Sequence, residues 1–90
     1  MKTLPIEVGS IVISKAGRDR GRLFLVVEEV DADFVMIANG ELRKLDRLKK
    51  KRRRHLKPTG TVIAALRDRK VEDHELRAWL REEEEKLVQV

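Results

Sequence analysis

Cysteine and tyrosine are absent from this 90-residue chain, and its only aromatic residues are two phenylalanines and one tryptophan. Without cysteine the chain cannot form disulfides, an iron–sulfur cluster or a cysteine-ligated zinc site. Two histidines, His55 and His74, are too few for a zinc site unless carboxylates join them. We therefore expect no metal and no cofactor, so that a small apolar core must stabilise the fold.

Long apolar runs are absent as well. No stretch approaches the ~18 apolar residues that span a bilayer, and the first residues lack the hydrophobic region of a signal peptide. We expect a cytoplasmic protein that has no membrane partner.

The chain also lacks the usual patterns of catalytic residues. Ser10 and Ser14 have no histidine and aspartate partners at a plausible spacing. The acids around Asp31 and Asp33 do not match a calcium-binding loop, which needs a glycine and a terminal glutamate. No phosphate-binding or dinucleotide-binding fingerprint is present. The sequence therefore predicts neither catalysis nor a small-molecule substrate.

Charge is plentiful and uneven: the chain carries 21 basic and 16 acidic residues. Residues 1–70 have a balance of +9, whereas residues 71–90 have a balance of −4. Ten basic residues crowd into positions 43–57, where Asp46 is the single acid. Because like charges at this density repel one another, the pattern favours a polyanionic partner. Without that partner we expect residues 47–54 to be mobile.

The apolar pattern predicts a mainly β fold with α structure at the C-terminus. Short apolar runs predict five strands, at residues 10–15, 22–30, 34–38, 41–45 and 55–57. Asn39-Gly40 predicts a tight hairpin turn because both residues tolerate positive φ, and Pro58 should end the last strand. Five strands that meander through tight turns predict a small five-stranded barrel over residues 1–58.

Residues 59–90 are expected to form a helical extension that packs on this barrel. The first of two short helices should span residues 61–70, after Pro58-Thr59-Gly60. The second has one apolar stripe, formed by Leu76, Trp79, Leu80 and Leu87. Asp73 is its predicted N-cap, with Glu72 as the alternative, and Glu82 to Glu85 should form a solvated face.

Residues 11–27, IVISKAGRDRGRLFLVV, resemble the KOW motif, in which a glycine-containing basic loop joins two hydrophobic strands. The chain departs from the family pattern at Leu23-Phe24-Leu25, where a further glycine is common. The chain is similar, over roughly residues 7–58, to bacterial KOW-domain RNA-binding proteins, which are related to large-subunit ribosomal proteins of archaea and eukaryotes. The resemblance implies a small SH3-like barrel that binds RNA, commonly ribosomal RNA.

The residues themselves also favour RNA, because arginine forks match phosphate oxygens and contacts of this kind position a protein without reading sequence. Gly17 and Gly21 would let backbone N–H groups approach a phosphate. Phe24 and Phe34 are expected in the core, which leaves few stacking platforms and favours structured RNA. The predicted RNA-binding side chains are Lys15, Arg18, Arg20, Arg22, Arg43, Lys44, Arg47, Lys49, Lys50, Lys51, Arg52, Arg53, Arg54 and Lys57.

Two other readings remain open at this point. The barrel could instead be a protein-interaction module of transcription or translation, or it could bind double-stranded DNA. If the protein binds RNA, we expect its partner to be ribosomal RNA or the ribosome, and we expect the free protein to be monomeric.

Overall fold

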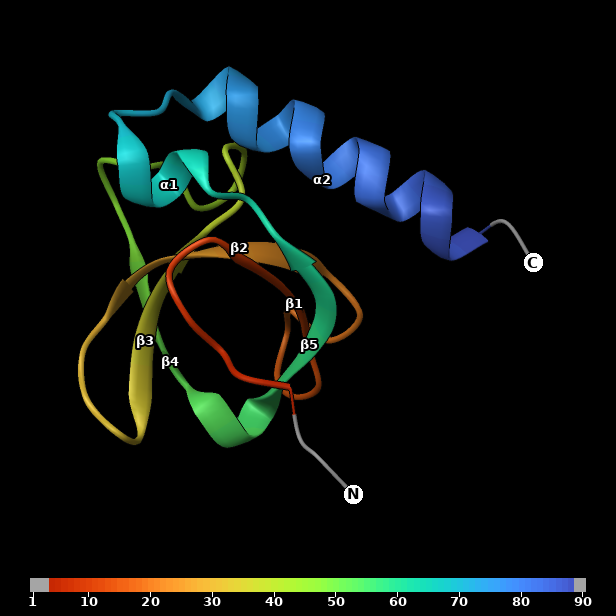
Figure 1. Cartoon of the computed structure of the whole chain (residues 1–90). Helices are drawn as coiled ribbons and strands as arrows, with labels where there is room; N and C mark the ends of the chain where they lie inside the picture. The colour runs from red at the N-terminus through yellow and green to blue at the C-terminus, as the bar shows by residue number, and fades with distance from the viewer. Residues whose placement is uncertain (1–3, 89–90) are drawn as a thin grey trace.

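A computed structural model describes residues 4–88 of the chain (Figure 1). Five strands come first and two helices last, with one 3₁₀ turn, η1, between the fourth and fifth strands. The elements are β1 Ser10–Ser14, β2 Leu23–Glu29, β3 Phe34–Ala38, β4 Lys49–Arg52, η1 Arg53–His55, β5 Leu56–Val62, α1 Ala65–Asp68 and α2 Asp73–Val88. Within residues 4–88, no helix is long and apolar enough to cross a membrane.

The five strands form one antiparallel sheet in the order β4-β3-β2-β1-β5. The sheet curls round so that η1 joins the two edge strands, β4 and β5 (Figure 1). The predicted fold class, a mainly β chain with a small five-stranded SH3-like barrel and C-terminal helices, is confirmed.

The sheet has two apolar faces, which explains why β2 is apolar without interruption at Leu-Phe-Leu-Val-Val. Phe24 and Val26 point into the barrel, where they pack with Val12, Val35, Ile37 and Leu56. Leu25 points the other way and packs with Ile11, Ala38, Val71, Leu76 and Leu80. The core is therefore double, with one half inside the barrel and the other half under α2.

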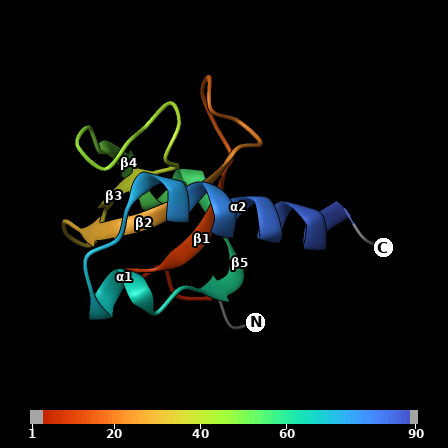
Figure 2. The ribbon, with the colours of Figure 1, turned by 90° about the horizontal axis from the view of Figure 1, so that it is seen from above.

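The long C-terminal helix, α2, was predicted correctly in its position and its apolar stripe. Leu76 and Leu80 are buried and Trp79 packs against the same cluster, but α2 continues beyond the barrel, so Leu87 is 49% exposed (Figures 1 and 2). The N-cap is the alternative residue, Glu72: its carbonyl accepts from the Leu76 N–H at 3.2 Å, and its N–H donates to the Glu75 carboxylate at 3.2 Å.

Residues 39–48 form a loop, so the predicted hairpin turn at Asn39-Gly40 and the predicted strand at 41–45 are wrong. The Asn39 Oδ1 accepts hydrogen bonds from the backbone N–H groups of Glu41 (3.0 Å) and Arg43 (2.9 Å). An asparagine side chain that binds its own backbone offers the chain an alternative to a two-residue turn. The partner of β3 is β4, so residues 49–52 belong to the sheet, and the expectation that residues 47–54 are mobile without RNA stays a prediction.

The fifth strand passes through Pro58 and continues to Val62, which corrects both its predicted end and the predicted helix at 61–70. Proline is tolerated because β5 is an edge strand. Thr59 donates from Oγ1 to the Ile11 carbonyl at 3.0 Å, and threonine favours strands. Only α1 remains of the predicted first helix.

The predicted solvated face of α2 is wrong at one position, because Glu83 is buried. Its Oε1 accepts a hydrogen bond from the Thr61 Oγ1 at 2.8 Å, which ties α2 to β5. The division of the chain at residue 58 stays a prediction. Residues 1–3 and 89–90, at the outer ends of the two predicted ranges, lie outside the described residues.

Candidate nucleic-acid interface

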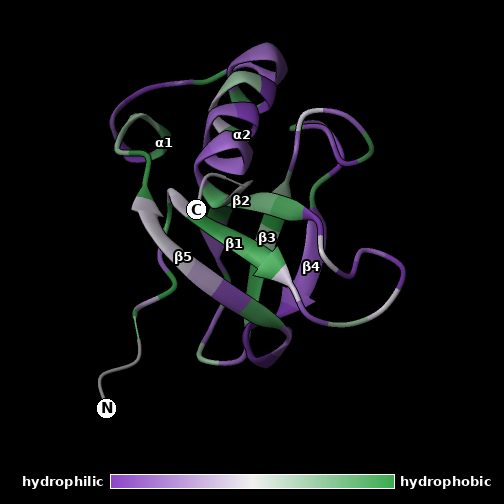
Figure 3. Cartoon of the chain, turned by 90° about the vertical axis from the view of Figure 1, so that its right-hand side faces the viewer, coloured by the Kyte–Doolittle hydropathy of each residue, from purple (hydrophilic) through white to green (hydrophobic). Residues whose placement is uncertain are grey.

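The basic segments of the sequence come together on one side of the barrel. The loop at 15–22, the loop at 39–48 and β4 between them are neighbours in two views (Figures 2 and 3). The 15–22 loop also touches η1, because the Lys15 N–H donates to the His55 carbonyl at 2.7 Å. We call these four segments the basic side. Lys57 stands next to it on β5, opposite Ile13 of β1.

Strand β4 divides its four basic residues between two faces of the sheet. Lys50 and Arg52 face outward, where they lie over the ring of Phe34, with the Lys50 Nζ 4.6 Å and the Arg52 Cζ 4.9 Å from its centroid. Phe34 was predicted in the core and is instead half-buried on the outer face. A ring in this position holds two cations in place through cation–π attraction.

The other two lysines of β4 hold the 15–22 loop. Lys51 is only 8% exposed, and its Nζ donates to the carbonyl of Ala16 at 3.1 Å. Lys49 forms an ion pair with Asp19 in the middle of the same loop. The structure therefore gives both lysines partners inside the protein, and both position the loop.

Arg53 is a third predicted RNA ligand that is occupied within the fold. Its guanidinium donates to the carbonyl of Ile6 at 2.7 Å, to the carbonyl of Asp31 at 2.9 Å and to the Glu29 carboxylate at 2.8 Å. Arg53 thus joins the N-terminal segment, the end of β2 and the β2–β3 turn. Its neighbours Arg52 and Arg54 are exposed.

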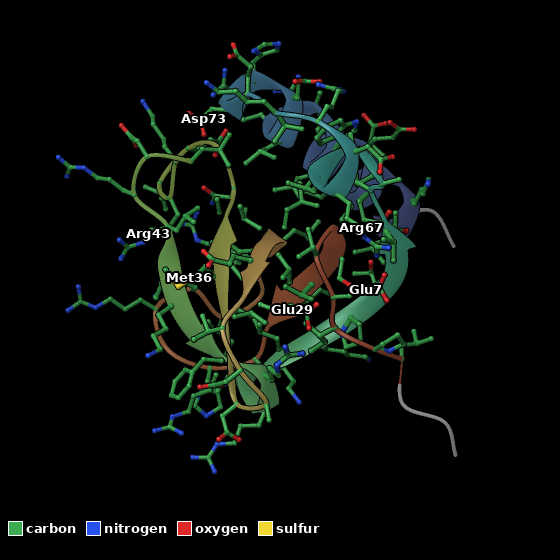
Figure 4. All side chains as sticks on the ribbon, turned by 60° about the vertical axis from the view of Figure 1, so that its left-hand side comes forward. Glu7, Glu29, Met36, Arg43, Arg67 and Asp73 are labelled. Carbon is green, nitrogen blue, oxygen red and sulfur yellow. The ribbon has the colours of Figure 1, made fainter. Side chains whose placement is uncertain are left out.

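All the other predicted ligands are exposed, and none of them has a carboxylate partner among residues 4–88. Arg43, for example, projects from the 39–48 loop away from the barrel (Figure 4). The eleven free cations are Lys15, Arg18, Arg20, Arg22, Arg43, Lys44, Arg47, Lys50, Arg52, Arg54 and Lys57.

The two glycines of the 15–22 loop both have positive φ, +78° at Gly17 and +87° at Gly21. Glycine adopts this conformation without a steric penalty. The Gly21 N–H donates to the Ser14 carbonyl at 2.8 Å, and the Ser14 N–H donates to the Arg22 carbonyl at 3.0 Å. The Gly21 amide therefore closes the loop, and it is not free to meet a phosphate as predicted.

No protein-family model matches the chain, but two curated archaeal relatives do. The large ribosomal subunit protein eL14 of Methanococcus maripaludis is 36% identical over 58 residues, which are 64% of this chain and 69% of the relative. The eL14 of Desulfurococcus amylolyticus is 33% identical over 58 residues, which are 64% of this chain and 60% of the relative. The chain belongs to the eL14 family. The chain spans less than two thirds of the length of the Desulfurococcus relative. Membership of this family agrees with the resemblance of residues 11–27 to KOW-type ribosomal proteins.

In this eL14-family chain, sequence reasoning missed the residue that fixes the 39–48 loop. Arg77 of α2 donates from Nη1 to the carbonyl of Gly40 at 2.7 Å. Asp73, labelled in Figure 4, accepts from the Leu45 N–H at 2.8 Å. A Cβ at Gly40 would lie 2.4 Å from the Asp73 carbonyl oxygen. These contacts join residues about thirty positions apart in the sequence, so no local sequence pattern predicts them.

The serines and histidines that could suggest catalysis or metal binding do not form such a site among residues 4–88 of this eL14-family chain. Ser10 and Ser14, considered as nucleophiles, are buried, with their hydroxyls bonded to the Glu7 N–H (2.9 Å) and the Ala16 carbonyl (3.1 Å). Among residues 4–88, no three histidine or acidic side chains gather where they could hold a metal ion. Partial burial, followed by the charge of Arg54, lowers the pKa of His55 below 6.5.

Acid should weaken the attachment of the 15–22 loop through Asp19. The hydrogen bond from Lys49 holds the pKa of Asp19 below its usual 3.8, and the charges of Lys51 and Arg43 act in the same direction. Because the folded pKa is depressed, this stabilisation is present above pH 3.8 and is lost as pH falls through the folded pKa. Asp19→Asn should therefore lower the free energy of unfolding at pH 7 by less than about 1 kcal/mol.

Urea denaturation of both proteins between pH 7 and pH 2 measures this effect. The difference in stability between wild type and Asp19→Asn should shrink as the pH falls below 3.8. A difference that stays constant down to pH 2 would show that the carboxylate charge contributes nothing.

Proposed function

We propose that this protein binds structured RNA, in the first place ribosomal RNA, through phosphate contacts made by the basic side of its barrel. On this proposal it acts without catalysis, on the ribosome and in the cytoplasm, and is monomeric when free. The observation that carries the proposal is the division among the fourteen predicted ligands. Three are held inside the fold, and the other eleven are exposed and have no acidic partner within residues 4–88.

A surface made in this way suits a phosphate backbone. Guanidinium forks bind phosphate oxygens with two parallel hydrogen bonds, and lysines add compact positive charge. The loops that carry these groups are fixed to β4 and α2 by Lys51 and Arg77. Cations presented from fixed loops lose less conformational freedom on binding than cations on mobile loops.

The aromatic residues favour shape recognition over the stacking of single-stranded bases. Phe24 is fully buried, Trp79 of α2 packs against the outer half of the core, and the ring of Phe34 lies beneath Lys50 and Arg52. Proteins that bind single strands use free aromatic rings as platforms for bases. Double-stranded and folded RNA is recognised mainly by shape, phosphates and 2′-hydroxyl groups.

The relatives support the ribosomal part of the proposal, because both are named as proteins of the large ribosomal subunit. The direct test is sedimentation of a cell lysate through sucrose gradients at 50 mM and 500 mM salt. We expect the protein to travel with the large subunit at low salt and to stay near the top at high salt, because counterions compete for phosphate.

The control for this experiment is a variant that loses two cations away from the basic side, Arg67→Gln on α1, which pairs with Glu7, and Lys86→Gln on α2, which pairs with Glu83. It should sediment like wild type. A protein that stays at the top of the gradient at both salt concentrations would contradict the ribosomal proposal. The same result, together with no binding of structured RNA, would favour the hypothesis that the barrel is a protein-interaction module.

A further inference from the structure

A groove of about 340 Å³ lies between α2 and the outer face of the sheet, next to the basic side. Its apolar surface comes from Ile13 of β1, Leu23 of β2, and Leu80 and Leu87 of α2. Its polar rim is formed by Gly21, Arg22, Asn39, Glu41, Arg77, Arg81 and Glu84. The groove therefore begins where the 15–22 loop ends.

The groove exists because α2 covers only part of the outer apolar face. Leu76 and Leu80 seal Ile11 and Leu25, which are at most 1% exposed. One step further along the two strands lie Ile13 and Leu23, which pair with each other and are only half-buried. The last turns of α2 extend past the barrel, so this end of the apolar face lacks a cover among residues 4–88 (Figure 1).

Several polar groups that line the groove have no partner within residues 4–88. Asn39 uses its Oδ1 for two loop hydrogen bonds, while its Nδ2 has no partner among the described residues and is not sealed in the core. Arg22 and Arg81 have no carboxylate partner within residues 4–88. The groove thus offers hydrogen-bond donors from the amide and two guanidinium groups, and acceptors from the carboxylates of Glu41 and Glu84.

We propose that this groove takes one unpaired nucleotide, such as a bulged base, from the RNA bound by the basic side. The inference rests on the proposed function and adds a single-nucleotide site to it. An apolar floor suits the face of a base, and the carboxylate and amide groups suit the amino and carbonyl groups on its edge. Arg22 belongs to both the groove and the basic side, so it can hold the phosphate that connects them.

Charge favours a nucleotide over an acidic or a purely apolar peptide. The rim has three arginines against two glutamates, and it adjoins the free cations of the 15–22 loop. A planar base with an attached phosphate satisfies the apolar floor and the cationic edge together. A purely apolar segment would leave four charged groups of the rim, Arg22, Glu41, Arg81 and Glu84, without partners.

Two hairpin RNAs with the same stem test the proposal. In one RNA a single 2-aminopurine is bulged, and in the other it is paired. We expect the bulged stem to bind about tenfold more tightly, because one hydrogen bond between the edge of a base and a charged group of the rim is worth at least that factor. In methyl NMR spectra of the complexes, the signals of the Ile13 and Leu23 methyl groups should change position with the bulged stem and remain unchanged with the paired stem.

Leu87→Gln makes the floor polar at a position that is already 49% exposed, so the fold should be retained. This variant should reduce the preference for the bulged stem to less than about threefold while leaving the affinity for the paired stem unchanged. Val62→Gln is the matched control, because Val62 is 45% exposed and lies outside the groove; it should keep the full preference.

The outcomes separate the two proposals. Equal affinity for the two stems, or a Leu87→Gln variant that retains the full preference, would overturn the nucleotide site and leave the basic side intact. If neither stem binds, the proposed function itself fails.

Discussion

Replacing Arg53 with alanine should lower the free energy of unfolding by about 2–3 kcal/mol, whereas Arg54→Ala should change it by less than about 0.5 kcal/mol. The guanidinium of Arg53 donates to two carbonyls and a carboxylate from three separate segments, at 2.7–2.9 Å. Hydrogen bonds to a charged group are each worth about 1.5–3 kcal/mol, and bonds that share one side chain do not add fully. A small domain with a margin of a few kcal/mol will be partly unfolded by this loss.

Urea denaturation followed by Trp79 fluorescence measures the effect, since Trp79 packs against the core under α2. Arg54→Ala is a matched control, because it removes the same group one residue away. Arg53→Lys is a second test: an ammonium retains the charge but cannot reproduce the planar fork, so it should recover less than half of the loss. Equal stability of the Arg53→Ala and Arg54→Ala proteins would contradict a structural role for Arg53.

This pair shows where sequence reasoning reaches its limit. Arg52, Arg53 and Arg54 are identical residues in one run, and composition cannot tell which of them turns inward. Their roles depend on strand register and on where β4 ends: β4 pairs Phe34 with Arg52, its last residue. Arg53 and Arg54 belong to η1, where the Arg53 N–H donates to the Asp33 carbonyl at 2.8 Å. The register became visible only once β4 was located.

The parts of the fold that were predicted have strong local signals. The first three strands carry β-branched or alternating apolar runs, and α2 has an apolar stripe at helical spacing. The position of the fourth strand was predicted wrongly because Lys49–Arg52 contains no apolar residue. Its place in the sheet is fixed by distant contacts, such as the one between Lys51 and Ala16, which override weak β-propensity.

The candidate site was predicted in outline for a related reason. Charge density alone identified the segments 15–22 and 43–57, and the fold brings them to one side of the molecule. Charge density could not separate lysines that position a loop from those that face solvent. The groove beside α2 was missed altogether, because Asn39, Arg81 and Leu87 belong to elements that meet only in the folded chain.

Neutralising four free cations should cause the largest functional loss. The variant changes Arg18 and Arg20 of the 15–22 loop, and Lys50 and Arg52 of β4, to glutamine. All four side chains are exposed, so stability should change little, apart from the contact with the ring of Phe34. We expect the affinity for a structured RNA at 0.1 M salt to fall by about a thousandfold.

This magnitude follows from counterion release. Each phosphate contact adds about 0.9 to the slope of log affinity against log salt, and the electrostatic contribution vanishes near 1 M salt. Four contacts are therefore worth about three to four decades at 0.1 M, and the slope of the variant should be shallower by about 3–4. Titrations at five salt concentrations between 0.05 and about 0.5 M measure the affinity and the slope together.

The two halves of the variant and a control locate the effect. Arg18→Gln with Arg20→Gln, and Lys50→Gln with Arg52→Gln, should each remove about half of the slope change. Arg67→Gln with Lys86→Gln should remove none, because these residues lie on α1 and α2 and pair with Glu7 and Glu83, outside the basic side. An unchanged slope in the fourfold variant would show that these residues do not contact phosphate. A loss confined to particular RNA sequences would mean that they read bases, since phosphate contacts weaken all RNAs alike.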